Sequence, residues 1–264
     1  MGDIGGGPGG AGGPGEPDPQ LRNDDTFAAW CRLRQSQGPR VSLIRLYAMA
    51  AEARGLRAHD LPLPERRILA ERAMPVVFPG WETVSGSDRH VEPIEVVPHD
   101  PAWPAAFRVW RDRLAGQLGA AAERIEHVGS TSVPGLAAKP VVDIQVSVAS
   151  LGQEGVYVPP CQAAGLQLRA RDDEHRFFRP PAGRPRGVHV HVCASGGSWE
   201  RVHLLFRDFL RASAGARESY AAMKREAALV WRDDRMGYTE AKNDLILDLL
   251  DEAEQWAAAD GWVC

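Results

Sequence analysis

The fold is decided by the stretch HVGSTSVPGLAAKPVVDIQV, residues 127–146. Its pattern predicts a β-strand, a turn rich in Gly and Ser, and a second strand. Side chains alternate between the two faces of a strand, so the second strand should have one apolar and one polar face. The apolar face carries Val142, Ile144, Val146 and Val148, and the polar face carries Asp143, Gln145 and Ser147.

The turn and the second strand together indicate a site for phosphate. The small residues Gly129, Ser130 and Thr131 let backbone N–H groups approach an anion closely. Asp143 can hold a divalent cation beside that anion. A phosphate cradle next to an acidic metal ligand is the minimum needed to bind a nucleoside triphosphate. An ordinary hairpin with one Asp on its polar face explains the same spacing, and both interpretations stay open.

The stretch closely resembles the signature of the GrpB (UPF0157) family. Three later motifs match that family in the same order: FRDFLR at 206–211, Tyr220 with Lys224, and YTxAK at 238–242. The resemblance covers residues 90–258. It implies a nucleotidyltransferase-like fold, a mixed sheet with helices, in which the Gly-Ser turn and the following carboxylate strand form the active site of better-known relatives. It leaves the reaction open.

Composition limits the class of protein. The chain has 264 residues, of which 44% are hydrophobic and 25% charged, with a formal net charge of −4. The slight acidity argues against broad adhesion to nucleic acid or to an anionic membrane, although it does not exclude a local basic patch. The four cysteines lie far apart, as expected for reduced thiols. No apolar run approaches the ~20 residues needed to span a bilayer. We therefore expect a soluble, cytoplasmic protein without a membrane partner.

The chain divides into three parts by composition. Residues 1–21 are dominated by Gly and Pro and should be disordered. Residues 22–88 predict a small helical module and a linker, with the third helix ending before Pro75 and the linker beginning at Pro79. This module is too short and too sparsely apolar for firm stability on its own.

Residues 89–264 predict the main domain, which the resemblance makes GrpB-like. Strands are expected at 91–97, 166–171, 174–179 and 187–193, in addition to the opening stretch. Helices are expected at 103–123, 152–165, 199–212 and 214–231, with a last helix capped by Thr239. Strands first and helices last predict an α+β fold whose C-terminal helices pack on a mixed sheet.

Metal binding is expected on the central strand. Active nucleotidyltransferases carry two carboxylates there, one residue apart, which hold two metal ions. The resemblance therefore implies metal ligands at Asp143 and Gln145, but the Gln145 amide supplies no charge to offset a dication. A single Mg²⁺ bridged by a nucleoside triphosphate, or nucleotide binding without transfer, fits these residues better.

Two histidines extend the candidate site. His189 and His191 project from one face of the strand expected at 187–193. Next to Asp143 they would form a His/His/Asp cluster suited to a transition metal or to acid–base catalysis. We therefore take Asp143, His189 and His191 as the candidate catalytic residues. The alternative is two half-exposed histidines bonded to neighbouring backbone.

Four basic residues are candidates for binding phosphate. Lys139 precedes Pro140, which favours an extended backbone from which the ammonium can reach a phosphate oxygen. Arg176 is the best candidate among the six arginines between residues 169 and 186, because nearby carboxylates should pair with the others. Lys139 as a solvated hairpin lysine is the competing interpretation.

The other two candidates, Arg207 and Arg211, are four residues apart on an expected helix. With Lys224 and Lys242 they form either a basic wall opposite the Gly-Ser turn or a salt-bridged helical surface.

Three functions are compatible with these residues. The first is a nucleotidyltransferase-like enzyme that binds a nucleoside triphosphate with Mg²⁺ and transfers a nucleotidyl or phosphoryl group. The second is a non-catalytic nucleotide- or anion-binding module whose N-terminal helices dock a partner. The third is a metal phosphoesterase that depends on His189 and His191. Each takes a small-molecule nucleotide or phosphate ester as partner, and fold alone does not decide among them.

Overall fold

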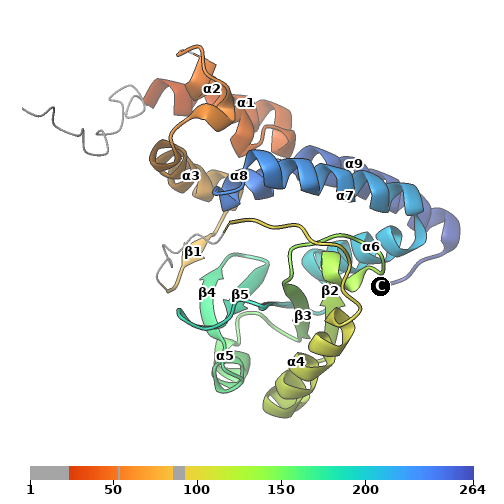
Figure 1. The fold of residues 1–264 in the computed structure, drawn as a ribbon. Coiled ribbons are helices and arrows are strands. Elements are labelled where there is room, and N and C mark those ends of the chain that lie inside the picture. Colours follow the sequence, from red (N-terminus) through yellow and green to blue (C-terminus); the bar gives the residue numbers. More distant parts are fainter. Residues whose placement is uncertain (1–23, 53, 86–92) are drawn as a thin grey trace, which may run out of the picture.

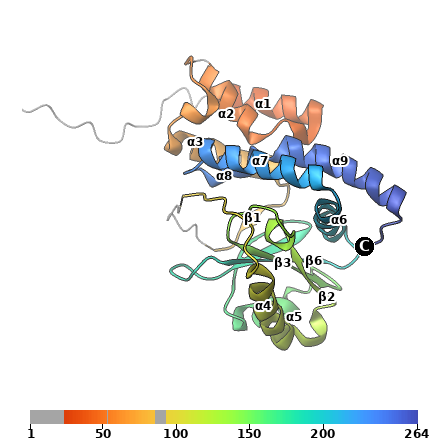
Figure 2. The same ribbon diagram turned by 45° about the vertical axis from the view of Figure 1, so that its right-hand side comes forward.

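The computed structural model describes residues 24–52, 54–85 and 93–264. The tail at 1–21, predicted to be disordered, lies outside this range. So do parts of the predicted linker and of the strand predicted at 91–97. Figures 1 and 2 show a layered α+β molecule, as the sequence predicts.

A mixed sheet of six strands forms the centre of the described chain, in the order β1-β4-β5-β6-β3-β2. The neighbouring strands β3 and β6 are parallel, whereas the other neighbours are antiparallel. The strands are β1 (Glu82–Thr83), β2 (Arg124–Val128), β3 (Val142–Val148), β4 (Gln167–Arg171), β5 (His175–Arg179) and β6 (Val188–Ala194).

The apolar face of the sheet packs against helices α4 (Trp103–Leu118) and α5 (Glu154–Ala163). The branched residues of β3 predicted to point to one side lie in this core together with Leu114 and Leu118. Helix α4 was expected to reach residue 123 but ends at Leu118, because Gly119 adopts a positive φ of 52°.

The polar face lies under α6 (Ser198–Ala212), which continues into α7 (Ala214–Val230). The hydroxyl of Ser147 on β3 donates to Glu200 of α6 at 2.5 Å. The prediction of one last helix capped by Thr239 is wrong. Two helices are present, α8 (Arg235–Glu240) and α9 (Asn243–Asp260), and Asp234 caps α8 by accepting from the Gly237 N–H at 3.0 Å.

The N-terminal helices α1 (Asp24–Gln37), α2 (Leu43–Glu52) and α3 (Leu63–Val77) form a separate layer on α7 and α8 (Figure 2). Trp30 and Tyr47 share a hydrophobic core with Trp231 and Tyr238. The predicted stop before Pro75 is wrong, because the Phe78 N–H donates to the Met74 carbonyl at 2.8 Å and α3 continues past the proline. None of the described helices is long and apolar enough to cross a bilayer.

Two connecting segments differ from expectation. Part of the predicted linker forms the short edge strand β1, which pairs with β4. The described part of the strand predicted at 91–97 forms only one isolated bridge, between Val97 and Ala138. The Ile94 N–H donates instead to the Arg232 carbonyl at 2.8 Å, which ties this segment to the end of α7.

We predict that Arg66→Met destabilises the protein by about 3–5 kcal/mol, because it leaves the Asp234 carboxylate buried without its partner. The Arg66 Nη1 lies 2.9 Å from Asp234 Oδ2, with the two side chains 11% and 6% exposed. Urea unfolding measures the change. The control is Arg57→Met, which removes an exposed pair with Asp60 and should leave stability unchanged. Equal effects of the two substitutions would contradict the role of the buried pair.

Candidate functional site

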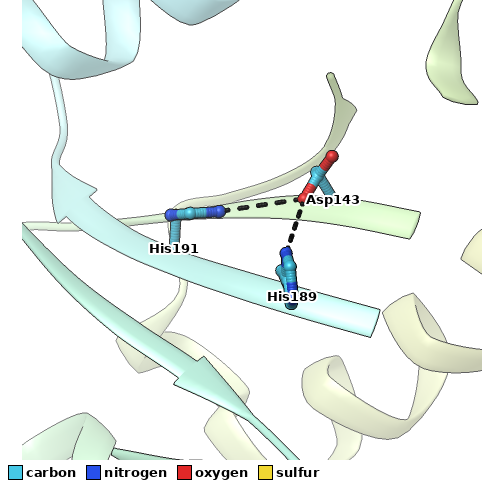
Figure 3. A group of neighbouring side chains, drawn as sticks. All are labelled: Asp143, His189 and His191. Atoms are coloured by element: carbon cyan, nitrogen blue, oxygen red, sulfur yellow. Dashed lines mark hydrogen bonds and ion pairs between the residues drawn. The ribbon is translucent and has the colours of Figure 1, made fainter. Parts of the chain in front are cut away.

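Three side chains from two neighbouring strands converge at the centre of the polar face (Figure 3). The parallel register of β3 and β6 places His189 beside Asp143 and His191 beside Gln145. His189 Nδ1 lies 3.2 Å from Asp143 Oδ1, and His191 Nε2 lies 3.9 Å from the same oxygen. The structure thus brings together the three residues that the sequence suggested as a cluster.

The charge states of this cluster follow from burial and contact. Burial raises the pKa of Asp143, but the interactions with His189 and His191 outweigh it and hold that pKa well below its usual range. Burial lowers the pKa of His191, and the nearby Asp143 opposes this only in part. At neutral pH the cluster therefore combines an ionised carboxylate with a neutral His191 ring.

Aromatic rings pack against both histidines of the cluster. Trp199 stacks on His191 with ring centroids 5.2 Å apart, and His175 lies 5.6 Å away. Phe177 contacts His189 edge-on at 5.1 Å. These contacts fix the orientation of both imidazoles. Sequence reasoning missed this wall, although alternation along β5 could have placed Phe177 on the histidine face.

Gln145, unlike Asp143, does not line the cavities of the candidate site. Its side chain is fully buried, and neither of its amide atoms has a hydrogen-bond partner in the described chain. The cavities beside Asp143 include no atom of Gln145 in their lining. The structure therefore does not support the prediction of Gln145 as an accessible metal ligand.

The Gly-Ser turn is built around the Asp143 carboxylate. Gly129 has φ of 67°, and Asp143 Oδ2 occupies the space that a Cβ at this position would need. The Ser130 hydroxyl accepts a hydrogen bond from Lys224 Nζ at 2.9 Å. Thr131 is mostly buried and donates to the Val141 carbonyl at 3.2 Å, so it holds the loop together at the wall of the lysine-lined cavity.

All three lysines of the chain, Lys139, Lys224 and Lys242, line one cavity of about 200 Å³. The ring of Tyr238 lies between two of them, 5.4 Å from Lys139 Nζ and 4.5 Å from Lys242 Nζ. Asp143, His189 and Ser130 also line this cavity. No lysine forms an ion pair with a carboxylate among the described residues, so the salt-bridged surface considered for Lys224 and Lys242 is wrong.

Burial is the main reason why these ammonium groups lose protons easily. It lowers the pKa of Lys224 to about 7, with help from Lys242 and Arg225. Burial also lowers the pKa of Lys139 to about 8, aided by Arg235. The pKa of Lys242 falls to about 8 for the same reason, aided by Lys139. The lining of the cavity therefore lacks the negative charge that would stabilise three ammonium groups.

A second cavity of about 250 Å³ begins on the other side of Asp143, between α6, α7 and α9. Its walls are mostly apolar, and His203, Arg207 and Tyr220 supply polar groups. Ser130, Asp143 and Lys242 line both cavities. Asp143 therefore stands at the junction of a cationic cavity and an apolar one.

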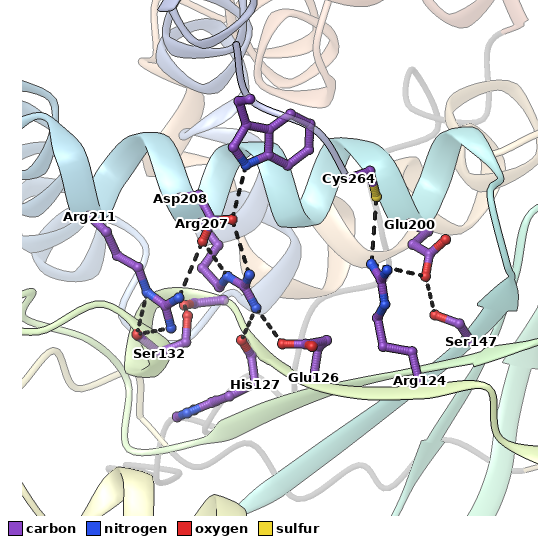
Figure 4. A network of polar contacts seen from close by, with 12 residues as sticks. Arg124, Glu126, His127, Ser132, Ser147, Glu200, Arg207, Asp208, Arg211 and Cys264 are labelled. Carbon is purple, nitrogen blue, oxygen red and sulfur yellow. Dashed lines mark hydrogen bonds and ion pairs between the residues drawn. The ribbon is translucent and has the colours of Figure 1, made fainter. Parts of the chain in front are cut away.

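The predicted arginines are engaged elsewhere (Figure 4). Arg207 reaches the edge of the apolar cavity, but its guanidinium pairs with Glu126 and Asp208, both at 2.7 Å. Arg211 Nη2 donates to the Ser132 carbonyl at 2.9 Å and so holds the Gly-Ser turn.

Arg176, predicted to bind phosphate, lines neither of the two cavities beside Asp143. In the register of β5 and β6 it pairs with Val192, so its side chain lies on the apolar face rather than the histidine face. There its Nε donates to Glu154 at 2.6 Å.

The family model described as GrpB protein matches residues 93–252. The chain belongs to the GrpB family. A UPF0157 protein of Streptomyces coelicolor is 43% identical over 155 residues, which cover 59% of this chain and 81% of that protein. The crystal structure of a conserved GrpB protein from Enterococcus faecalis is similar with a TM-score of 0.55 and 27% identity, over 61% of this chain and 99% of that one.

Another group of relatives is longer. A protein of Mycolicibacterium paratuberculosis named dephospho-CoA kinase is 34% identical over 198 residues, which cover 64% of this chain but 48% of that protein. The GrpB match in this chain includes Asp143, both histidines and all three lysines, and begins after the N-terminal helices.

We predict that Gly129→Ala destabilises the protein more than Gly135→Ala, although both glycines have positive φ. A positive φ costs a non-glycine residue roughly 1–2 kcal/mol at either position. Only at Gly129 must the Asp143 carboxylate also move, because a Cβ at Gly135 meets no atom within 4 Å. Chemical denaturation of the two variants measures the difference. Equal losses of stability would show that Asp143 does not depend on the turn.

Proposed function

We propose that the cleft binds the phosphate groups of a nucleoside triphosphate in the lysine cavity and supports nucleotidyl or phosphoryl transfer beside Asp143. The observation that carries this proposal is the charge of the cavity. Three ammonium groups face one ionised carboxylate, so its lining has an excess of two positive charges when the lysines are protonated. A polyphosphate supplies the missing negative charge.

Burial makes this charge excess significant. Lys224 is 2% exposed, so water screens its ammonium poorly. The lowered pKa values mean that the empty cavity disfavours its own positive charges, and an anion would relieve that repulsion. The lysine ammonium is a compact point charge, which suits it to binding a phosphate oxygen.

The three lysines have different roles because their positions in the cavity differ. Lys139 and Lys242 are the ammonium groups placed to contact phosphate, on either side of Tyr238. Lys224 donates to Ser130 and to the Ala137 carbonyl, and so fixes both ends of the loop that forms the cavity wall. The apolar cavity beyond Asp143 is the place for the second reactant, because both cavities meet at that carboxylate.

The two-magnesium arrangement of active nucleotidyltransferases does not fit these residues. Mg²⁺ prefers oxygen ligands, and the cluster offers one carboxylate and two imidazoles. Gln145 is buried where a second carboxylate would stand. In this proposal Mg²⁺ arrives coordinated by the triphosphate rather than by the empty protein.

The relatives named dephospho-CoA kinase do not make this chain a kinase. The chain contains no GxxxxGK[S/T] phosphate-binding loop, since no lysine follows a glycine. Those relatives support only the link between GrpB-like sequence and proteins of phosphoryl chemistry.

We predict that ATP or inorganic triphosphate stabilises the protein, and that Lys139→Gln and Lys242→Gln abolish this stabilisation. A ligand at 100 times its Kd should add about 2.7 kcal/mol. Thermal unfolding with and without ligand and Mg²⁺ is the measurement. The matched control is Arg108→Gln, which removes one positive charge from the exposed surface of α4 and should leave the ligand effect intact. Ligand stabilisation that survives both lysine substitutions would contradict the proposal.

We also expect the affinity for triphosphate to fall as pH rises from 7 to 9. Lys139 and Lys242 have pKa values of about 8, so both lose their charge within this range, whereas unperturbed lysines would keep it. Titration calorimetry at several pH values measures the affinity. Lys242→Arg, which stays charged throughout, should weaken the pH dependence. An affinity that rises with pH would exclude the lysines as the anion ligands.

A further inference from the structure

The Asp143–His189–His191 cluster has the geometry of a metal site. One oxygen of Asp143, one nitrogen of His189 and one nitrogen of His191 all lie within 4.8 Å of one another. Among the described residues, no other group of three or more His, Cys, Asp and Glu side chains has such an arrangement. The ligand atoms point toward a common space in Figure 3.

Only one of the two histidines lies within hydrogen-bonding distance of the carboxylate, His189 Nδ1 at 3.2 Å from Asp143 Oδ1. His191 Nε2 lies 3.9 Å from Asp143 Oδ1, which is too long for a hydrogen bond. Metal–ligand bonds of about 2.0–2.2 Å place neighbouring ligand atoms roughly 3 to 3.5 Å apart. The two distances to Asp143 Oδ1, 3.2 and 3.9 Å, are close to that range, so small side-chain rotations would bring these atoms onto one ion.

We infer that these three residues bind a single transition-metal ion, such as Zn²⁺ or Mn²⁺, in preference to Mg²⁺. Two imidazoles and one carboxylate suit first-row transition metals and leave other positions of the ion open. Those open positions face the lysine cavity, because Asp143 and His189 line it. The inference goes beyond the proposed function and does not rest on it, because ion binding is measured without nucleotide.

The surroundings support a preformed site. Trp199 packs on His191 and Phe177 packs on His189, so the orientation of both imidazoles is restricted before an ion binds.

The test uses the full chain, stripped of metal with EDTA and titrated calorimetrically with ZnCl₂, MnCl₂ and MgCl₂ in turn. We expect one equivalent of Zn²⁺ or Mn²⁺ to bind, with Mg²⁺ at least roughly 100-fold weaker. His191→Gln and Asp143→Asn should each weaken transition-metal binding by more than the 10–100-fold typical of supporting residues. The absence of binding by every ion, or tighter binding of Mg²⁺, would overturn the inference.

Two further variants make the assignment specific. His59→Gln changes a histidine between α2 and α3, away from the cluster, and it should bind metal like the wild type. His189→Cys loaded with Co²⁺ should show a thiolate-to-cobalt absorption band that wild-type protein lacks. Loss of binding in His59→Gln, or no new band in His189→Cys, would place the ion elsewhere. Circular dichroism of each variant checks that the fold is retained.

Discussion

The parallel pairing of β3 and β6 is the constraint on which the rest of the cleft depends. In this register Asp143 lies beside His189 and Gln145 beside His191, with all four on the same face of the sheet. A shift of one residue would send the histidines into the apolar core and the valines into the cleft. The continuous apolar face of both strands, buried against α4 and α5, excludes that shift. Packing on one side of the sheet therefore fixes the chemistry on the other.

The helices supply further side chains around the cluster on the sheet. Helix α6 supplies Trp199 and its contact with His191, and α7 supplies Lys224, which is bonded to Ser130. The N-terminal helices pack against Tyr238, whose ring lies between two lysines. Tyr238 belongs to the core that includes Trp30 and Tyr47. Glu240 also accepts the Leu43 N–H at 3.0 Å, where α2 begins. These N-terminal helices thus support the wall of the lysine cavity, even though the family match begins after them.

Local patterns in the sequence determined much of the fold and part of the site. Alternation along β3 and β6 was enough to place Asp143, His189 and His191 on one face. The same rule could have removed Arg176 from the cleft, since it shares its face of β5 with the buried Phe178. The three lysines could be picked out in the sequence, because the other basic residues among the 31 are arginines. Their convergence on one cavity could not be predicted, because α7 and the segment after α8 meet the loop before β3 only through tertiary packing. The buried pair of Arg66 with Asp234 likewise joins residues that are distant in sequence.

The central claim is that Asp143 joins a metal site on β6 to a phosphate site formed by the lysines. Anomalous diffraction from crystals soaked in MnCl₂ and inorganic triphosphate tests it most directly. The account predicts one manganese peak within bonding distance of Asp143, His189 and His191, with phosphate density between Lys139 and Lys242. Manganese found only on surface carboxylates, or triphosphate bound outside the lysine cavity, would contradict it.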